Sequence, residues 1–98
     1  MAEIEFSKAA EADLDDIDDY SVTRFGAGIA DRYMRGFDEA FARLGDFPKV
    51  GRPMPALGAG VRCLIHRRHR VFYRLSEERV LILRIVHHAQ NVRRPSLR

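Results

Sequence analysis

The sequence predicts an α+β fold with the element order β-α-α-β-β-β, in which a two-helix hairpin packs on a small, mostly antiparallel sheet. Three observations predict it. Apolar residues recur at helical spacing in the first half of the chain, β-branched and aromatic residues form three short runs in the second half, and a stretch rich in Gly and Pro separates the halves. At 98 residues, the chain is expected to form one hydrophobic core.

The first half is expected to hold a short strand and a helical hairpin. Residues 4–6 alternate apolar and acidic side chains, which predicts the strand, and Ser7 is a suitable N-cap for the helix that follows. The apolar stripe of this helix consists of Ala10, Leu14, Ile17, Ser21 and Phe25. Gly26 ends it, and the short connection makes it antiparallel to a second helix over residues 27–44. The second stripe consists of Ala30, Tyr33, Met34, Phe37, Phe41 and Leu44. Gly36 lies inside this second helix, where a close approach of another element would explain it.

The second half is expected to be a long loop followed by three strands. Residues 45–60 contain three Pro and four Gly, and loops of this length in small domains tend to be functional. The predicted strands cover residues 61–65, 71–75 and 80–86. The first hairpin turns within residues 66–70 and the second at residues 76–79, and the tail from His87 is assigned no regular structure.

The last predicted strand is apolar on both faces. Strict alternation places Leu81, Leu83 and Ile85 on one face and Val80, Ile82 and Val86 on the other. Because helices cover only one face of a two-layer fold, the second apolar face indicates a protein partner.

The net charge of +3 conceals two halves of opposite sign. Residues 1–48 contain five Lys or Arg and twelve Asp or Glu, whereas residues 49–98 contain twelve Lys or Arg and two Glu. The basic half is expected to attract nucleic acid or an acidic protein surface. The alternative is that the two halves attract each other within one fold.

The composition indicates a soluble cytoplasmic protein without a cofactor. No apolar run is long enough to cross a bilayer, and the N-terminus lacks the basic-then-apolar order of a secretory signal. The single cysteine, Cys63, cannot form an internal disulfide, which is typical of a reducing compartment. One Cys and four His without ligand spacing indicate no metal site.

Four local patterns follow one another along the chain. They are residues 6–20 (FSKAAEADLDDIDDY), Phe25-Gly26 followed by Ala30 and Tyr33, residues 44–52 (LGDFPKVGR), and residues 69–74 (HRVFYR) with residues 82–87 (ILRIVH). Together they resemble the ParE/RelE superfamily of toxins, and the ParE branch in particular. The resemblance extends from Ile4 to about Asn91. Residues 1–91 are therefore expected to form a single toxin-like domain, and residues 92–98 a basic C-terminal tail.

The resemblance implies the toxin of a type II toxin–antitoxin pair. Its partner would be a ParD-like antitoxin, in a hetero-oligomer, whose C-terminal segment wraps the toxin. The last strand's face formed by Val80, Ile82 and Val86 is expected to meet this antitoxin. ParE-type toxins are understood to inhibit DNA gyrase, whereas RelE-type relatives cut messenger RNA on the ribosome. Neither activity implies a membrane or a small-molecule substrate.

The predicted hairpin tip is the main candidate for contact with the gyrase–DNA complex or the antitoxin. Four adjacent basic residues repel one another unless an anion is bound, and two arginines in the tail have the same sign. These candidates are Arg67, Arg68, His69, Arg70, Arg93 and Arg94. The alternative is a solvated basic turn.

A RelE-like endoribonuclease is the second hypothesis. It needs an acid, a base and cations for the phosphate, which His87, Arg62 and Arg84 could supply. However, no Tyr follows Tyr73, Lys49 is the only lysine of the basic half, and His87 in ParE-like members has a structural role. The sequence therefore favours a non-enzymatic inhibitor of gyrase. A plain nucleic-acid-binding module is a third hypothesis.

Several polar residues are expected to be structural. Tyr20 and Tyr73 are interpreted as core residues with satisfied hydroxyls, and Cys63 as a small buried apolar residue. Arg74 and Arg84 are expected to pair with the acidic residues of the first helix.

Overall fold

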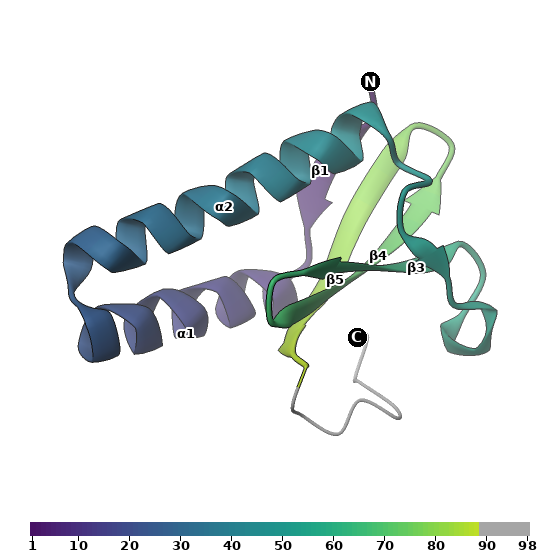
Figure 1. Cartoon of the computed structure of the whole chain (residues 1–98). Coiled ribbons are helices and arrows are strands. Elements are labelled where there is room, and N and C mark those ends of the chain that lie inside the picture. Colours follow the sequence, from purple (N-terminus) through teal and green to yellow (C-terminus); the bar gives the residue numbers. More distant parts are fainter. Residues whose placement is uncertain (89–98) are drawn as a thin grey trace.

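The computed structural model describes residues 1–88 and confirms the predicted α+β fold. Its elements are β1 (Glu3–Phe6), α1 (Lys8–Phe25), α2 (Ala27–Asp46), β2 (Arg52–Pro53), a 3-10 turn η1 (Pro55–Leu57), β3 (Val61–His66), β4 (His69–Ser76) and β5 (Arg79–His87). The sheet order is β1-β5-β4-β3-β2, and only β1 and β5 pair in parallel. The two helices form a hairpin on one side of this sheet (Figure 1). The predicted boundary between residues 91 and 92 lies outside the described residues and stays a prediction.

The helix α1 begins at the predicted N-cap. The Ser7 hydroxyl accepts a hydrogen bond from the Ala10 N–H at 3.0 Å and donates one to the Leu83 carbonyl at 2.9 Å, which ties the helix start to β5. Gly26, with φ of 86°, ends α1 as predicted. The expectation that Tyr20 and Phe25 are core residues was wrong, because they are 61% and 54% exposed. The far end of the helical hairpin projects beyond the sheet, so no strand covers these side chains (Figure 1).

The helix α2 packs closely against the β3–β4 hairpin at Gly36. A Cβ at this position would lie 3.3 Å from the Arg67 guanidinium and 3.3 Å from the His66 ring. This confirms the expected close approach of another element. Phe37 and Leu44 on the same helix are fully buried and pack against the apolar side chains of β4 and β5.

A bulge in β5 changes which side chains share a face. Tyr73 pairs with Ile82, but Phe72 pairs with Arg84, so Leu83 has no partner of its own on β4. The additional residue reverses the alternation, and Ile85 joins Val80 and Ile82 in the core under the helices. The assignment of Val80, Ile82 and Val86 to one exposed face was therefore wrong. Val80 and Ile82 are fully buried in the core, and the surface available to a partner lies elsewhere.

The loop after α2 is folded around one buried side chain. Tyr73 is fully buried, and its hydroxyl donates to the Pro48 carbonyl at 2.7 Å and accepts from the Gly51 N–H at 2.9 Å. This confirms the interpretation of Tyr73 as a core residue with a satisfied hydroxyl. Instead of an unstructured loop, the segment contains the short edge strand β2 and the turn η1.

Neither helix of the described residues 1–88 is both long and apolar enough to span a membrane.

Candidate functional site

A groove runs beneath the helical hairpin, between α1, the start of α2 and the ends of β4 and β5. Its volume is about 850 Å³. The apolar lining consists of Ile17, Tyr20, Phe25, Ile29, Tyr33 and Ile85. The groove also contains charged side chains, which are Asp13 and Asp16 on one wall and Arg68 and Arg84 on the other. Three of the apolar side chains (Tyr20, Phe25 and Ile29) are about half exposed or more, so the groove offers a large apolar surface to a partner.

Asp13 closes the edge of β5 inside this groove. Strand β1 pairs with β5 only as far as Ile82, which leaves the outer backbone edge of the following residues without a neighbouring strand. The Asp13 carboxylate accepts a hydrogen bond from the Ile85 N–H at 2.9 Å and is bound by the Arg84 guanidinium at 2.8 and 3.0 Å. The hydrogen bond to Asp13 raises the pKa of Arg84. The predicted pairing of Arg84 with helix α1 is confirmed, whereas Arg74 binds the Ala59 carbonyl and not an acid of α1.

Substitution of Asp13 by alanine should lower the free energy of unfolding by about 2 kcal/mol. The change removes the two charge-assisted hydrogen bonds between Asp13 and Arg84 and leaves the Ile85 N–H without its acceptor. Urea denaturation measures the effect. Asp13→Asn keeps one carbonyl oxygen and should lower the free energy of unfolding by less. Asp16→Ala removes an exposed carboxylate from the same helix and should leave the free energy of unfolding nearly unchanged. Equal losses in Asp13→Ala and Asp16→Ala would refute a specific role for Asp13.

The predicted basic cluster at the β3–β4 hairpin does not form one patch. The Arg67 guanidinium lies over the Tyr33 ring, 5.3 Å from its centroid, and Arg68 lines the groove. His69 is only 8% exposed, and its Nδ1 lies 2.9 Å from the Tyr33 hydroxyl. Arg70 points to the face of the sheet away from the helices, because it alternates with the core residue Val71. The predicted contacts Arg93 and Arg94 lie outside the described residues.

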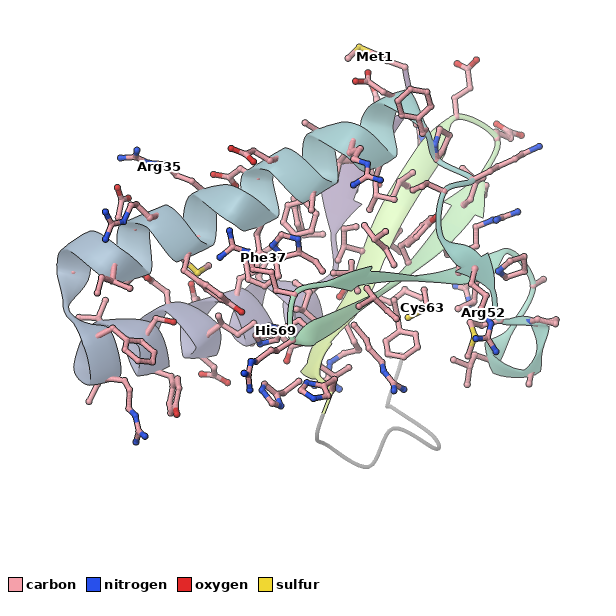
Figure 2. All side chains as sticks on the ribbon, in the orientation of Figure 1. Met1, Arg35, Phe37, Arg52, Cys63 and His69 are labelled. Carbon is pink, nitrogen blue, oxygen red and sulfur yellow. The ribbon has the colours of Figure 1, made fainter. Side chains whose placement is uncertain are left out.

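The structure brings the four histidines together at this end of the sheet. The ring of His69 lies 5.3 Å from that of His87, and His87 lies 4.8 Å from His88. The Phe37 ring contacts His66 in a tilted arrangement and His69 edge-on, and Figure 2 shows Phe37 and His69 close together under α2. Burial, reinforced by the neighbouring histidines, lowers the pKa of His69 from 6.5 to about 4. His69 is therefore neutral at pH 7 and is not the cationic surface contact that was predicted.

The candidate ribonuclease residues are held apart. Arg62 pairs with Tyr73, which pairs with Ile82, so Arg62 lies level with Ile82 in the sheet. His87 pairs with His69, four residues from Tyr73 along β4, so it lies about 13 Å farther along the sheet at 3.3 Å per residue. Arg62 donates to the carbonyls of Lys49 and Gly51, and Arg84 binds Asp13. Each arginine thus has a structural partner. Arg62 lies away from His87, and Arg84, which lines the same groove as His87, is bound by Asp13.

The groove was not predicted from the sequence. Tyr20 was assigned to the core, and Ile29 was assigned no function. The missing signal is the length of the helices relative to the sheet, which leaves the apolar stripe uncovered at its far end. Cys63 is half-buried and not fully buried as expected, and burial raises the pKa of its thiol.

A family model described as the ParE toxin of the type II toxin–antitoxin system parDE matches residues 4–92. The chain is 38% identical to Toxin ParE1 of Caulobacter vibrioides over 93 residues, which cover 95% of this chain and 96% of that protein. It is 33% identical to Toxin ParE1 of Mycobacterium tuberculosis over 89 residues, which cover 90% of this chain and 91% of that protein.

Two solved structures have the same fold. A chain of the chromosomal ParDE toxin–antitoxin system from P. aeruginosa superposes with a TM-score of 0.73 at 28% identity, covering 89% of this chain and 96% of that one. A chain of the toxin–antitoxin complex RelBE2 from Mycobacterium tuberculosis superposes with a TM-score of 0.67 at 26% identity. The match covers 88% of this chain and 96% of that one.

Proposed function

This chain belongs to the ParE toxin family of type II toxin–antitoxin systems, and on that premise we propose that it inhibits DNA gyrase in the cytoplasm by protein binding and is neutralised by a ParD-like antitoxin. The observation that supports binding over catalysis is the separation of Arg62 from His87. Cleavage of RNA needs acid, base and cationic groups within hydrogen-bond reach of one phosphate. In the described residues Arg62 lies away from His87 along the sheet, and the guanidinium groups of Arg62 and Arg84 are both engaged in structural contacts.

The groove under the helical hairpin supports the antitoxin half of the proposal. Its apolar lining suits the apolar face of an amphipathic segment, and Arg68 at its rim suits an acidic residue on that segment. The P. aeruginosa structure comes from a ParDE system, in which toxin and antitoxin are paired. We therefore place the antitoxin contact in the groove, and not on the buried residues Val80 and Ile82.

A gyrase assay tests the proposal. Purified toxin should inhibit supercoiling of plasmid DNA by gyrase and increase cleaved DNA, and the ParD-like antitoxin should abolish both effects. No effect on gyrase, together with cleavage of ribosome-bound messenger RNA that His87→Gln abolishes, would establish the RelE-like alternative instead.

The antitoxin contact is tested separately by Ile29→Glu. A carboxylate in the apolar groove should weaken antitoxin binding at least about tenfold, measured by calorimetric titration. The variant should fold, because an acidic residue is favourable in the first turn of α2. Val22→Glu is the matched control, since Val22 is similarly exposed but lines the opposite side of the helical hairpin. Equal affinities for the two variants would exclude the groove as the antitoxin site.

A further inference from the structure

Three arginines share the face of the sheet that the helices leave uncovered, here called the helix-free face. Tyr73 and Val71 of β4 point into the core, so their neighbours Arg70 and Arg74 point the other way. Phe72 lies between these two and pairs with Cys63, which in turn pairs with Arg52 of β2. Residues that pair directly across strands share a face. Arg52, Arg70 and Arg74 therefore surround Cys63 and Phe72 on one face.

The three guanidinium groups have no carboxylate partner within residues 1–88. The ion pairs of this part of the chain are Arg35–Asp31 and Arg84–Asp13, which lie elsewhere. Arg70 and Arg52 are close enough to Cys63 to oppose the rise in its pKa that burial causes. Figure 2 shows Arg52 and Cys63 on the side of the sheet away from α2. Cations without an acidic partner on one face attract a polyanion.

Negative charge lies along the opposite edge of the same face. On β1, Ile4 and Phe6 pack against the core, so Glu3 and Glu5 point to the helix-free face. Glu5 is level with Leu81, which pairs with Arg74, so about 10 Å separate the backbones of Glu5 and Arg74. The acidic edge confines a bound polyanion to strands β2, β3 and β4.

The side chains of this face favour a duplex over a single strand. Sheet surfaces that bind single-stranded RNA or DNA present exposed aromatic rings on which bases stack. Phe72, the aromatic residue between the arginines, is only 1% exposed. Arg70 and Arg74 are about 13 Å apart along β4, which is comparable to the width of the major groove of B-DNA, about 12 Å. The face thus offers cations to phosphates on two strands and no stacking surface.

We propose that the helix-free face binds the phosphate backbone of duplex DNA through Arg52, Arg70 and Arg74. That this DNA is the segment held by gyrase rests on the proposed function. The proposed contact between this face and DNA does not depend on gyrase.

The test measures the affinity of the full chain for a fluorescent 30-base-pair duplex, by anisotropy, from 50 to 200 mM NaCl. Each phosphate contact contributes about 0.9 to the slope of log K against log salt concentration. The variant R52Q/R70Q/R74Q should therefore lose about 2.7 from that slope. Arg32→Gln, which removes an exposed arginine from α2, is the matched control and should change nothing. Glu5→Gln should tighten binding, because it removes a repelling charge from the edge of the same face.

An unchanged slope in the triple variant would overturn the proposal, as would an equal loss in Arg32→Gln or tighter binding to a single-stranded RNA of the same length. A slope that disappears on substitution of Arg93 and Arg94 alone would also overturn it. Unfolding by urea confirms that each variant is folded. Salt-dependent DNA binding without any effect on gyrase would leave this proposal standing and reject the proposed function.

Discussion

Replacement of Gly51 by alanine should lower the free energy of unfolding by at least about 3 kcal/mol. A Cβ at Gly51 would lie 2.5 Å from the Tyr73 hydroxyl oxygen and 2.6 Å from a ring carbon, which is far closer than van der Waals contact. Tyr73 is fully buried and cannot move aside without opening the core. The added methyl group thus combines overpacking, which costs about 1–3 kcal/mol, with loss of the hydrogen bonds to Pro48 and Gly51.

Two further variants distinguish this cause from a general sensitivity to alanine. Gly28→Ala is the control, because nothing lies within 4 Å of its added Cβ and alanine favours the helix, so the free energy of unfolding should rise slightly. The double variant Gly51→Ala/Tyr73→Phe should be less destabilised than the sum of the two single changes, since the hydroxyl is the nearest obstacle. Urea denaturation of the wild type, Gly51→Ala, Tyr73→Phe and the double variant gives the coupling energy, and strict additivity would contradict the explanation.

The loop illustrates what the sequence could and could not predict. Residues 44–52 were identified as a pattern from their resemblance to a family, but the reason for Gly51 lies 22 positions away, in the Tyr73 hydroxyl. Contacts of this kind depend on the position of β4 in the sheet, which is not encoded near the glycine. By contrast, the Ser7 cap and the Gly26 helix end are local features, and both were predicted correctly.

The candidate surfaces were harder to predict than the elements. Val80 and Ile82 lie in the core and not on the expected surface, and one additional residue at Leu83 reverses the alternation of β5 after it, which brings Ile85 to the same face. The hairpin sequence from Arg67 to Arg70 looks like one cationic patch, yet its side chains diverge because strand residues alternate and the turn lies against α2. The total charge of each half follows from the sequence alone. How the charged side chains divide between the two faces of the sheet depends on the strand register, which the sequence does not give directly.

Acidification should destabilise the protein through His69. Its pKa is about 4 in the folded protein and near 6.5 in an exposed chain, so between these values the unfolded chain binds more protons. The free energy of unfolding is therefore unaffected by this group above pH 6.5 and falls as the pH is lowered toward 4. A difference of this size corresponds to about 3 kcal/mol. Burial also lowers the pKa of His66, which adds to the loss in the same direction.

The charged neighbours of His69 in the described residues all oppose its protonation. Tyr33 on α2 has its pKa raised by burial and stays neutral, while His66 on β3 and His87 and His88 at the end of β5 add like charge when protonated. Arg67 and Arg68 in the turn are also cationic. Urea denaturation at several pH values between 4.5 and 7.5 should show the loss, and an NMR titration of the imidazole should give the low pKa directly.

A non-titrating replacement isolates the contribution of His69. His69→Asn retains an acceptor for the Tyr33 hydroxyl and should remove most of the pH dependence, whereas His88→Gln, at an exposed position, should reduce it only slightly, because His88 is the weakest of the charges that act on His69. An acid-induced loss of the same size in His69→Asn would assign the effect to other groups, with His66 the next to substitute. Loss of the pH dependence in His69→Asn alone would show that the packing of the β3–β4 hairpin against α2 depends on a neutral imidazole, because the charge would otherwise be buried beside Phe37.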